Sequence, residues 1–164
     1  MIDLIIMDVD GCLTDGKIIY TNAGDEIKAF NVKDGLAISS WIRLGHQAVI
    51  ITGRHSHLLE RRVKELGITA FHQGVKDKAA LLRKLSEESG IALRNMAAIG
   101  DDLNDYKMLS MVGLSFTPQD ASGHIKAMAG KVCEAKGGEG AVREMIEELF
   151  VINDEVDEFL ALWQ

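Results

Sequence analysis

Residues 5–16 read IIMDVDGCLTDG, an apolar run that ends in two aspartates one residue apart, Asp8 and Asp10. The residues before Asp8 do not alternate between apolar and polar, which is typical of a strand buried on both faces. Carboxylates directly after such a strand lie at the end of a sheet, where α/β proteins bind ligands. The stretch therefore predicts either an ordinary strand-to-turn junction or a reactive site at the sheet edge.

Short runs rich in β-branched residues recur along the chain and are separated by helical patterns. Strands that alternate with helices predict a parallel sheet covered on both faces. The expected class is α/β, a Rossmann-like three-layer sandwich with a mostly parallel central sheet. Strands are expected at 4–9, 47–52, 96–101, 113–117 and 131–135, and helices at 35–44, 56–66, 77–89, 103–111, 120–129 and 140–150.

One segment interrupts this alternation. Residues 17–31, KIIYTNAGDEIKAFN, predict two short strands around a turn, a β-hairpin inserted between the first strand and the first helix. We expect the hairpin to project beside the strand ends or to pair with another subunit. With 164 residues and no linker-like tract, residues 1–164 are expected to form a single domain, because domains commonly have about 100 to 200 residues.

The charge is unevenly distributed. Residues 144–164 hold seven acidic residues and no Lys or Arg, which accounts for the whole net charge of -7. An acidic chain without a basic stripe is not expected to bind nucleic acid or an anionic membrane. The apolar start is bounded by Asp3 and Asp8, unlike a signal peptide, so a cytoplasmic protein is expected. The two cysteines, Cys12 and Cys133, are expected to be free thiols.

Four polar motifs fall at or just past predicted strand ends, so they should meet at one edge of the sheet. They are DVDG (8–11), ITGR (51–54), KDK (76–78, at the start of a helix) and GDDLND (100–105). Carboxylates gathered there repel one another unless a cation neutralises them, and oxygen ligands without His or Cys favour Mg²⁺. Carboxylates, Mg²⁺, a hydroxyl and cationic side chains together indicate phosphoryl transfer. The carboxylates concerned are Asp8, Asp10, Asp101 and Asp105.

These four motifs, in this order, resemble those of the haloacid dehalogenase superfamily of phosphotransferases. The resemblance implies that Asp8 is the nucleophile, which forms an aspartyl-phosphate, and that Asp10 is the general acid and base. Thr52 would hydrogen-bond the phosphoryl oxygens, and Lys78 would steady the nucleophile and the developing charge. Lys76 is the alternative lysine, but family members mostly place theirs just inside the helix, as Lys78 is.

The same resemblance implies a Mg²⁺ site. Asp101 would bind the ion together with the Asp8 carboxylate and the Asp10 backbone carbonyl. Asp105 would contribute mainly from behind these ligands, and Asp102 and Asn104 would support them.

The spacing between motifs leaves no room for a cap domain. Only a hairpin and a helix separate Asp10 from Thr52, and only a helix and a short strand separate Thr52 from Lys78. With FNVKDGLAI (30–38) and GGEGAVRE (137–144), the chain resembles the capless 3-deoxy-D-manno-octulosonate 8-phosphate phosphatases. This resemblance implies a homotetramer assembled by the hairpins, in which a neighbouring subunit completes each site.

The implied substrate is a sugar-acid phosphate, which needs cations at two places. Arg54 and Arg62 are candidates, although Arg62 could also be a solvated helix residue; Arg143 could instead pair with Glu144 or Glu147. Phosphates of nine-carbon sialic-type acids are the alternative substrates, and a non-catalytic tetramerising domain is the alternative function. The expected substrate-binding residues are Asp10, Gly53, Arg54, Arg62, Lys78, Asn104 and Arg143.

The C-terminal segment has apolar residues at helical spacing. They form one stripe that is expected to pack on its own domain or on a neighbouring subunit. The stripe consists of Val156, Phe159, Leu160 and Trp163.

Overall fold

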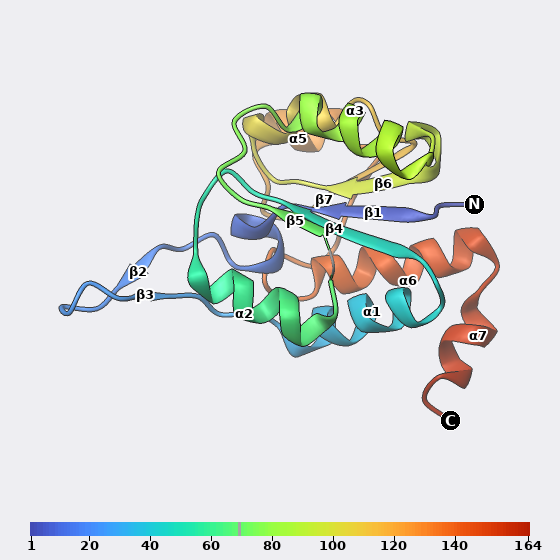
Figure 1. Ribbon diagram of the computed structural model, residues 1–164, viewed down its shortest axis with the longest axis horizontal. Coiled ribbons are helices and arrows are strands. Elements are labelled where there is room, and N and C mark those ends of the chain that lie inside the picture. The colour runs from blue at the N-terminus through green and yellow to red at the C-terminus, as the bar shows by residue number, and fades with distance from the viewer. Residues whose placement is uncertain (69) are drawn as a thin grey trace.

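A parallel six-stranded sheet forms the centre of the structure, a computed structural model that describes residues 1–68 and 70–164. The strand order places β1 in the middle, paired in parallel with β4 on one side and β6 on the other (Figure 1). The predicted α/β class is therefore confirmed. In spatial order the strands are β5 (Ala70–His72), β4 (Gln47–Ile51), β1 (Leu4–Met7), β6 (Met96–Ile99), β7 (Leu114–Thr117) and β8 (Lys131–Val132).

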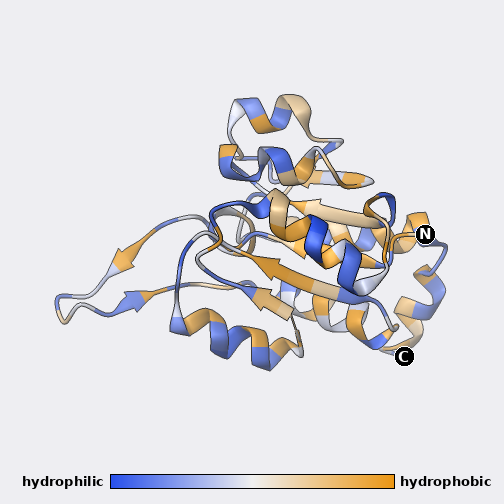
Figure 2. Cartoon of the chain, turned by 45° about the horizontal axis from the view of Figure 1, so that its top comes forward, coloured by the Kyte–Doolittle hydropathy of each residue, from blue (hydrophilic) through white to orange (hydrophobic). Residues whose placement is uncertain are grey.

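The sheet separates two layers of helices (Figure 1). Side chains of β1 alternate between the layers: Ile5 and Met7 pack in one apolar cluster, and Leu4 and Ile6 in the other. Figure 2 shows the central strands as mostly apolar. One layer contains α1 (Val32–Arg43), α2 (His57–Leu66) and α6 (Ala141–Asn153); the other contains α3 (Lys78–Ser89), α4 (Tyr106–Leu109) and α5 (Gly123–Met128).

The predicted helix 103–111 is divided in the structure. A 3-10 helix, Leu103–Asp105, precedes the short α4, and a second one lies at Leu93–Asn95. Asp105 lies at the junction of the 3-10 helix and α4, and its carboxylate turns back and accepts a hydrogen bond from the Asp101 backbone N–H, 3.1 Å away. The observed strands β1, β4 and β6 end one or two residues before the expected positions, where the chain turns away and carries the polar motifs.

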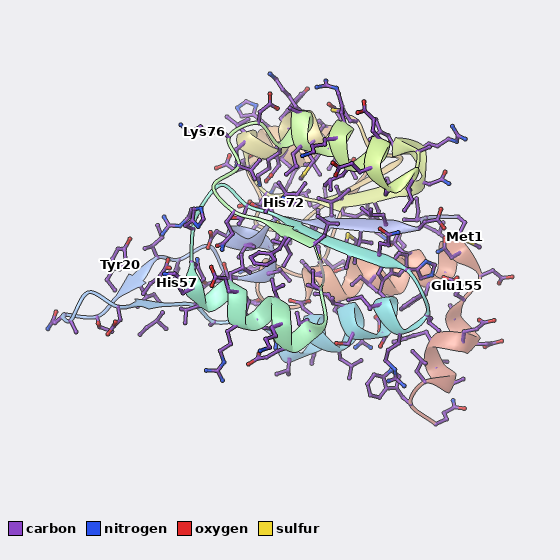
Figure 3. The ribbon with its side chains drawn as sticks, viewed as in Figure 1. Met1, Tyr20, His57, His72, Lys76 and Glu155 are labelled. Atoms are coloured by element: carbon purple, nitrogen blue, oxygen red, sulfur yellow. The ribbon has the colours of Figure 1, made fainter. Side chains whose placement is uncertain are left out.

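The hairpin lies within the predicted segment. Its strands, β2 (Ile19–Tyr20) and β3 (Glu26–Ile27), are antiparallel and project away from the sheet (Figure 1). Tyr20 lies on this projection (Figure 3) and is 66% exposed. The segments between the motifs contain the expected elements and, within the described residues, no cap domain.

The C-terminal helix α7 (Val156–Ala161) packs on its own chain through part of the predicted stripe. Phe159 is buried and stacks on Phe150, with ring centroids 4.7 Å apart. The Trp163 indole N–H donates to the Ser40 hydroxyl at 3.2 Å. The rest of the stripe, Val156 and Leu160, is exposed. None of the helices in the described residues combines the length and apolar character that crossing a membrane requires.

A glycine-rich loop, residues 136–140, supports the turn after β1. That turn, Val9–Leu13, is a helical turn kinked at Gly11. The Gly138 backbone N–H donates to the Cys12 carbonyl at 2.9 Å. A Cβ on Gly137 would lie only 1.9 Å from the Gly11 carbonyl oxygen. The two backbones therefore approach as closely as only glycine permits.

We expect Gly137→Ala to destabilise the fold, because the added methyl group meets backbone atoms that cannot rotate away. The expected loss is about 1–3 kcal/mol in the free energy of unfolding, the usual cost of overpacking. Urea unfolding measures it. Gly123→Ala is the control, because nothing lies within 4 Å of the added Cβ. Equal stabilities of the two variants would contradict the close contact.

Candidate active site

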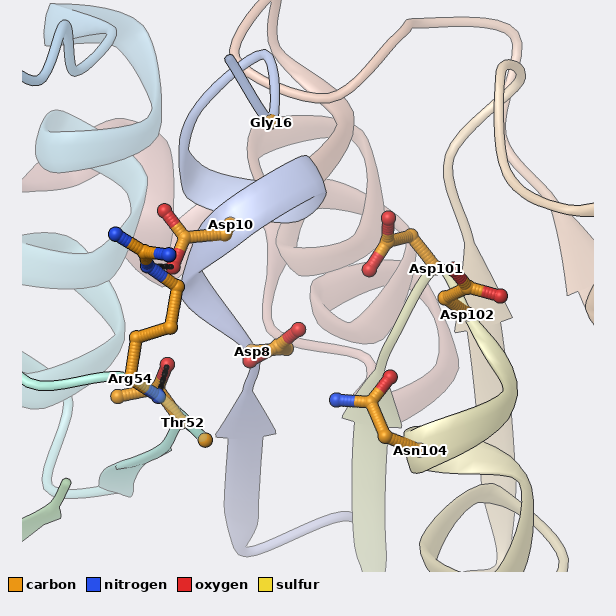
Figure 4. A pocket seen from close by; sticks show the side chains of 9 residues that line it. Asp8, Asp10, Gly16, Thr52, Arg54, Asp101, Asp102 and Asn104 are labelled. Carbon is orange, nitrogen blue, oxygen red and sulfur yellow. Dashed lines mark hydrogen bonds and ion pairs between the residues drawn. The ribbon is translucent and has the colours of Figure 1, made fainter. Parts of the chain in front are cut away.

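Three of the four polar motifs line a cavity of about 260 Å³ at the carboxyl edge of the sheet (Figure 4), and the fourth, KDK, reaches Asp8 through Lys78. Asp8 lies at the tip of β1, with Thr52 and Arg54 on one side of it and Asp101 and Asn104 on the other (Figure 4). Because neighbouring parallel strands end at the same edge, residues distant in sequence become neighbours here. The lining residues are Asp8, Asp10, Gly16, Thr52, Gly53, Arg54, Asp101, Asp102 and Asn104.

Lys78 joins two carboxylates below this cavity. Its ammonium group lies 2.8 Å from Asp8 Oδ1 and 2.6 Å from Asp105 Oδ1, and all three side chains are buried. Lys78 is the first residue of α3, and Asp77 caps that helix by accepting a hydrogen bond from the Ala80 N–H. Burial alone would lower the pKa of Lys78, but the two carboxylates outweigh it and raise this pKa. Lys78 is thus held as a cation, whereas Lys76 is exposed on the preceding loop (Figure 3).

Two carboxylates at the cavity hold their protons unusually firmly. Burial, followed by the charge of Asp105, raises the pKa of Asp8 to about 6. Burial, followed by the charges of Asp8 and Asp105, raises the pKa of Asp101 to about 7. Carboxylates that repel one another in this way favour a cation between them.

The donor atoms in this place fit a hard divalent ion. Oxygens of Asp8 and Asp101 and the Cys12 sulfur lie within 4.8 Å of one another. Burial raises the pKa of the Cys12 thiol well above its usual range, so the sulfur stays a neutral thiol and the carboxylates are the effective ligands. Oxygen ligands of this kind suit Mg²⁺.

Gly11 allows the turn after β1 to approach these ligands. A Cβ there would lie 2.0 Å from Asp101 Oδ2, and the φ of Gly11 is +95°, a conformation that other residues resist. The DxDG sequence thus requires its glycine in order to bring the two motifs together.

Asp105 is not available as a direct metal ligand. It is fully buried; Oδ1 accepts from Lys78, and Oδ2 accepts from the Asp101 N–H at 3.1 Å. This placement agrees with the expectation that it works from behind the ligands. Asp102, the residue before the 3-10 helix Leu103–Asp105, and Asn104, within that helix, line the cavity.

Thr52 and Gly53 follow β4 on the opposite side of Asp8. Thr52 is buried, its N–H donates to the His72 carbonyl, and its hydroxyl accepts from the Arg54 N–H at 3.4 Å. These bonds fix the Thr52 hydroxyl and the Gly53 backbone at the cavity wall.

The Asp10 carboxylate has two cationic partners, Lys28 and Arg54, and the sequence motifs indicate neither pairing. Lys28, on the hairpin, donates a hydrogen bond to Asp10 Oδ1, and Arg54 Nε lies 3.7 Å from Asp10 Oδ2. Glu26 lies 3.0 Å from Arg54 Nη2 and 3.5 Å from Lys28 Nζ. The sequence does contain a signal for this charged face of the hairpin: Glu26 and Lys28 are two residues apart, and residues at that spacing in a strand lie on the same face.

Arg62, expected at the substrate, does not reach the cavity of its own chain. Its guanidinium donates to the Asn31 carbonyl at 3.4 Å, lies over the Phe30 ring and faces Glu65 at 3.5 Å. The reason is local: α2 packs against α1, and the Arg62 side chain lies at the contact between these two helices, where Asn31 and Glu65 pair with it.

Arg143 also points away from the cavity. Its Nε donates to Glu147 Oε1 at 2.6 Å, one helical turn along α6, and its guanidinium lies 5.5 Å from the centre of the Phe159 ring. The pairing with Glu147 that the sequence left open is therefore the one observed, and Arg143 does not line the cavity of its own chain.

A parallel sheet with paired aspartates after β1 and a lysine held against the first of them defines a haloacid dehalogenase-like hydrolase. A family model of that description matches residues 71–146. The 3-deoxy-D-manno-octulosonate 8-phosphate phosphatase of Escherichia coli strain K12 is 42% identical over 96% of this chain and 84% of its own. The chain therefore belongs to the 3-deoxy-D-manno-octulosonate 8-phosphate phosphatase family.

Solved structures agree with this membership. The phosphatase of this type from Moraxella catarrhalis, crystallised with magnesium, phosphate and KDO, gives a TM-score of 0.96 at 41% identity, covering 99% of this chain and 94% of that one. The Yersinia pestis enzyme gives 0.93 at 41% identity, covering 95% and 84%. A cobalt-bound form from Haemophilus influenzae gives 0.91 at 35% identity, covering 96% and 92%.

We expect the affinity for Mg²⁺ to fall as the pH is lowered through the raised pKa values of Asp101 and Asp8. Above both values the carboxylates are ionised and the affinity should level off. Below about pH 7 the ion must displace one proton, from Asp101, so the affinity should fall about tenfold per pH unit. Below about pH 6 it must also displace a proton from Asp8, so the affinity should fall by up to about a hundredfold per pH unit. Isothermal titration calorimetry in two buffers of different ionisation enthalpy measures both affinity and proton release.

Asp101→Asn is the matched variant for this experiment. It should bind Mg²⁺ more weakly and lose the proton release that occurs near pH 7. An affinity of the wild type that stays constant from pH 6 to pH 8 would contradict the assignment.

Proposed function

We propose that this chain is a Mg²⁺-dependent phosphatase that hydrolyses 3-deoxy-D-manno-octulosonate 8-phosphate to the free sugar acid and inorganic phosphate. The observation that carries the proposal is the buried Asp8 carboxylate, held by Lys78 at the base of the cavity and facing Asp101. The Moraxella catarrhalis relative, with its magnesium, phosphate and KDO, supports the choice of cofactor and substrate.

In the first chemical step, an Asp8 oxygen attacks phosphorus and the bond between phosphorus and the sugar oxygen breaks. Asp10 gives its proton to the leaving oxygen, so the sugar acid departs as an alcohol. Lys78 balances the charge on Asp8, and the Thr52 hydroxyl and Gly53 backbone bind the phosphoryl oxygens. The product of this step is an aspartyl-phosphate on Asp8.

In the second step, water displaces Asp8 from phosphorus. Asp10, now ionised, takes a proton from the attacking water; the bond from phosphorus to the Asp8 oxygen breaks, and phosphate is released. Asp8, the Asp10 carbonyl and Asp101 would hold Mg²⁺, which would supply positive charge to neutralise the phosphoryl oxygens. Asp105 holds the Asp101 backbone and Lys78 in place throughout.

Arg54 is assigned to the carboxylate of the sugar acid. It lines the cavity from the wall opposite Asp101 and carries a positive charge beyond Asp10. Asn104 offers an amide at the other wall, suited to hydroxyl groups. A nine-carbon acid is not favoured, because the relatives described above act on the eight-carbon one. A non-catalytic scaffold is not favoured either, because it has no use for buried carboxylates held against a lysine.

Phosphate release from the eight-carbon substrate and from a nine-carbon analogue, with and without Mg²⁺, tests the proposal. We expect kcat/KM to favour the eight-carbon substrate by at least about tenfold, the scale at which pockets discriminate one carbon. Asp8→Asn should reduce kcat by at least about 10³-fold, because it removes the nucleophile. Turnover of Asp8→Asn at the wild-type rate would exclude the covalent mechanism.

We also propose that the chain acts as a homotetramer whose hairpins meet, so that a neighbouring subunit covers each open cavity. The support is the apolar surface of the hairpin, where large side chains are 44–66% exposed. Covering them removes water from the site, which strengthens its electrostatic interactions. These side chains are Ile18, Ile19, Tyr20 and Ile27.

Light scattering after size-exclusion chromatography should give four times the mass of one chain. Ile19→Asp should dissociate this assembly and reduce kcat/KM, because it places a charge in the apolar contact. Val151→Asp is the matched control, because Val151 is 67% exposed and belongs to α6, whose carboxyl-terminal end lies far from the hairpin (Figure 1). A stable and fully active wild-type monomer would overturn the proposal.

A further inference from the structure

The hairpin of each chain reaches that chain's own active site through Lys28. The Lys28 side chain is only 2% exposed, and its ammonium group donates to Asp10 Oδ1 across 18 residues of sequence. A lysine buried to this extent requires partners, and the two here are Asp10 and Glu26.

Lys28 acts on the cavity only through other residues. The cavity is lined by Asp10 and Arg54, whereas Lys28 and Glu26 lie behind them. Glu26 contacts both cations, at 3.0 Å from Arg54 Nη2 and 3.5 Å from Lys28 Nζ. The hydrogen bonds that Arg54 donates to Tyr20 and Glu26 raise the pKa of Arg54, so the guanidinium is firmly charged.

We propose that Lys28 is a positioning residue for Asp10, and that Glu26 is a positioning residue for Arg54. This inference rests on the proposed function, because it assigns to the hairpin the orientation of the acid/base and of the sugar-acid contact. Glu26 begins β3 and Lys28 directly follows it, so the two side chains lie on the same face of the hairpin. We call this pair, Glu26 and Lys28, the hairpin clamp.

The physical reason is the freedom of Asp10. It follows a buried strand but lies in the turn before Gly11, with its side chain 19% exposed, so its carboxylate has room to rotate. A charge-assisted hydrogen bond from Lys28 fixes Oδ1 and leaves Oδ2, which lies 3.7 Å from Arg54 Nε, for the leaving oxygen and later the water. Proton transfer needs this alignment, and a displaced acid loses much of its effect.

The first test is Lys28→Met, which keeps the apolar stem and removes the ammonium group. We expect kcat to fall about 10- to 100-fold, part of what a general acid/base contributes, with KM changed less than about threefold. Lys28→Arg should recover most of the loss, because it restores a buried donor. Lys17→Met is the control, because Lys17 is a hairpin lysine whose side chain is 74% exposed and paired with Asp15.

The second test places Lys28→Met in the Asp10→Asn background. If Lys28 works through Asp10, the double variant should be no slower than Asp10→Asn alone. An equal further loss in that background would overturn the proposal, as would an unchanged kcat in Lys28→Met. Thermal unfolding and light scattering of each variant identify a folding or assembly defect, and Lys28→Gln replaces Lys28→Met if the latter does not fold.

Glu26→Gln tests the other half of the clamp. It should raise KM for the sugar-acid phosphate about 5- to 20-fold at nearly constant kcat, because uniform binding is lost when Arg54 is misplaced. It should leave KM for p-nitrophenyl phosphate, which has no carboxylate, unchanged. An equal rise of KM for both substrates would overturn the role of Glu26.

An incorrect substrate assignment would give a result that differs from an incorrect role for Lys28. If the wild type does not hydrolyse the sugar-acid phosphate but does hydrolyse p-nitrophenyl phosphate, the substrate assignment falls. The coupling between Lys28 and Asp10 is then measured with p-nitrophenyl phosphate, because water still needs Asp10 as its base. Absence of coupling there would refute the positioning role of Lys28 independently.

Discussion

The ammonium group of Lys78 lies between the carboxylates of Asp8 and Asp105, and none of the three side chains has appreciable access to water. One positive charge opposes two negative ones, and Asp101 adds a third. Burial, and after it the excess negative charge, raises the pKa values of Asp8 and Asp101. A buried cluster of this kind adds little net stability, but it determines where a divalent cation and a phosphate can bind.

Every member of this cluster is delivered by the end of a strand or the start of a helix. β1 brings Asp8, β6 brings Asp101 through Gly100, and α3 brings Lys78 at its first residue. The parallel order β4-β1-β6 makes these ends neighbours. The site is therefore a consequence of the topology, and an insertion that shifted one strand end would separate the cation from its carboxylates.

The same topology explains which parts of the site could be predicted from the sequence. Residues directly after buried strands have their positions fixed by the backbone, so Asp8, Thr52 and Asp101 were placed correctly. The long side chains of Arg62 and Arg143 lie outside the cavity of their own chain, because a side chain on a helix surface can pair with partners such as Asn31 and Glu147 that sequence spacing does not reveal. The sequence likewise predicts an unbroken helix at 103–111, whereas in the structure Asp105, which accepts a hydrogen bond from Lys78, stands between a 3-10 helix and α4.

The hairpin shows why Lys28 escaped prediction and why it matters to the architecture. Strands of two residues are too short to be stable alone, so this hairpin depends on the contacts of its two faces. Its inner face is ionic, through Glu26 and Lys28, and its outer face is apolar, through residues such as Ile19 and Ile27. The inner face is held by Asp10, and the outer face is the one that a neighbouring subunit would cover. Covering the hairpin would therefore also hold Lys28 against Asp10 in the active site. In the homotetramer proposed above, a neighbouring subunit that covers this apolar face would exclude water from the cavity, because the described residues contain no cap domain.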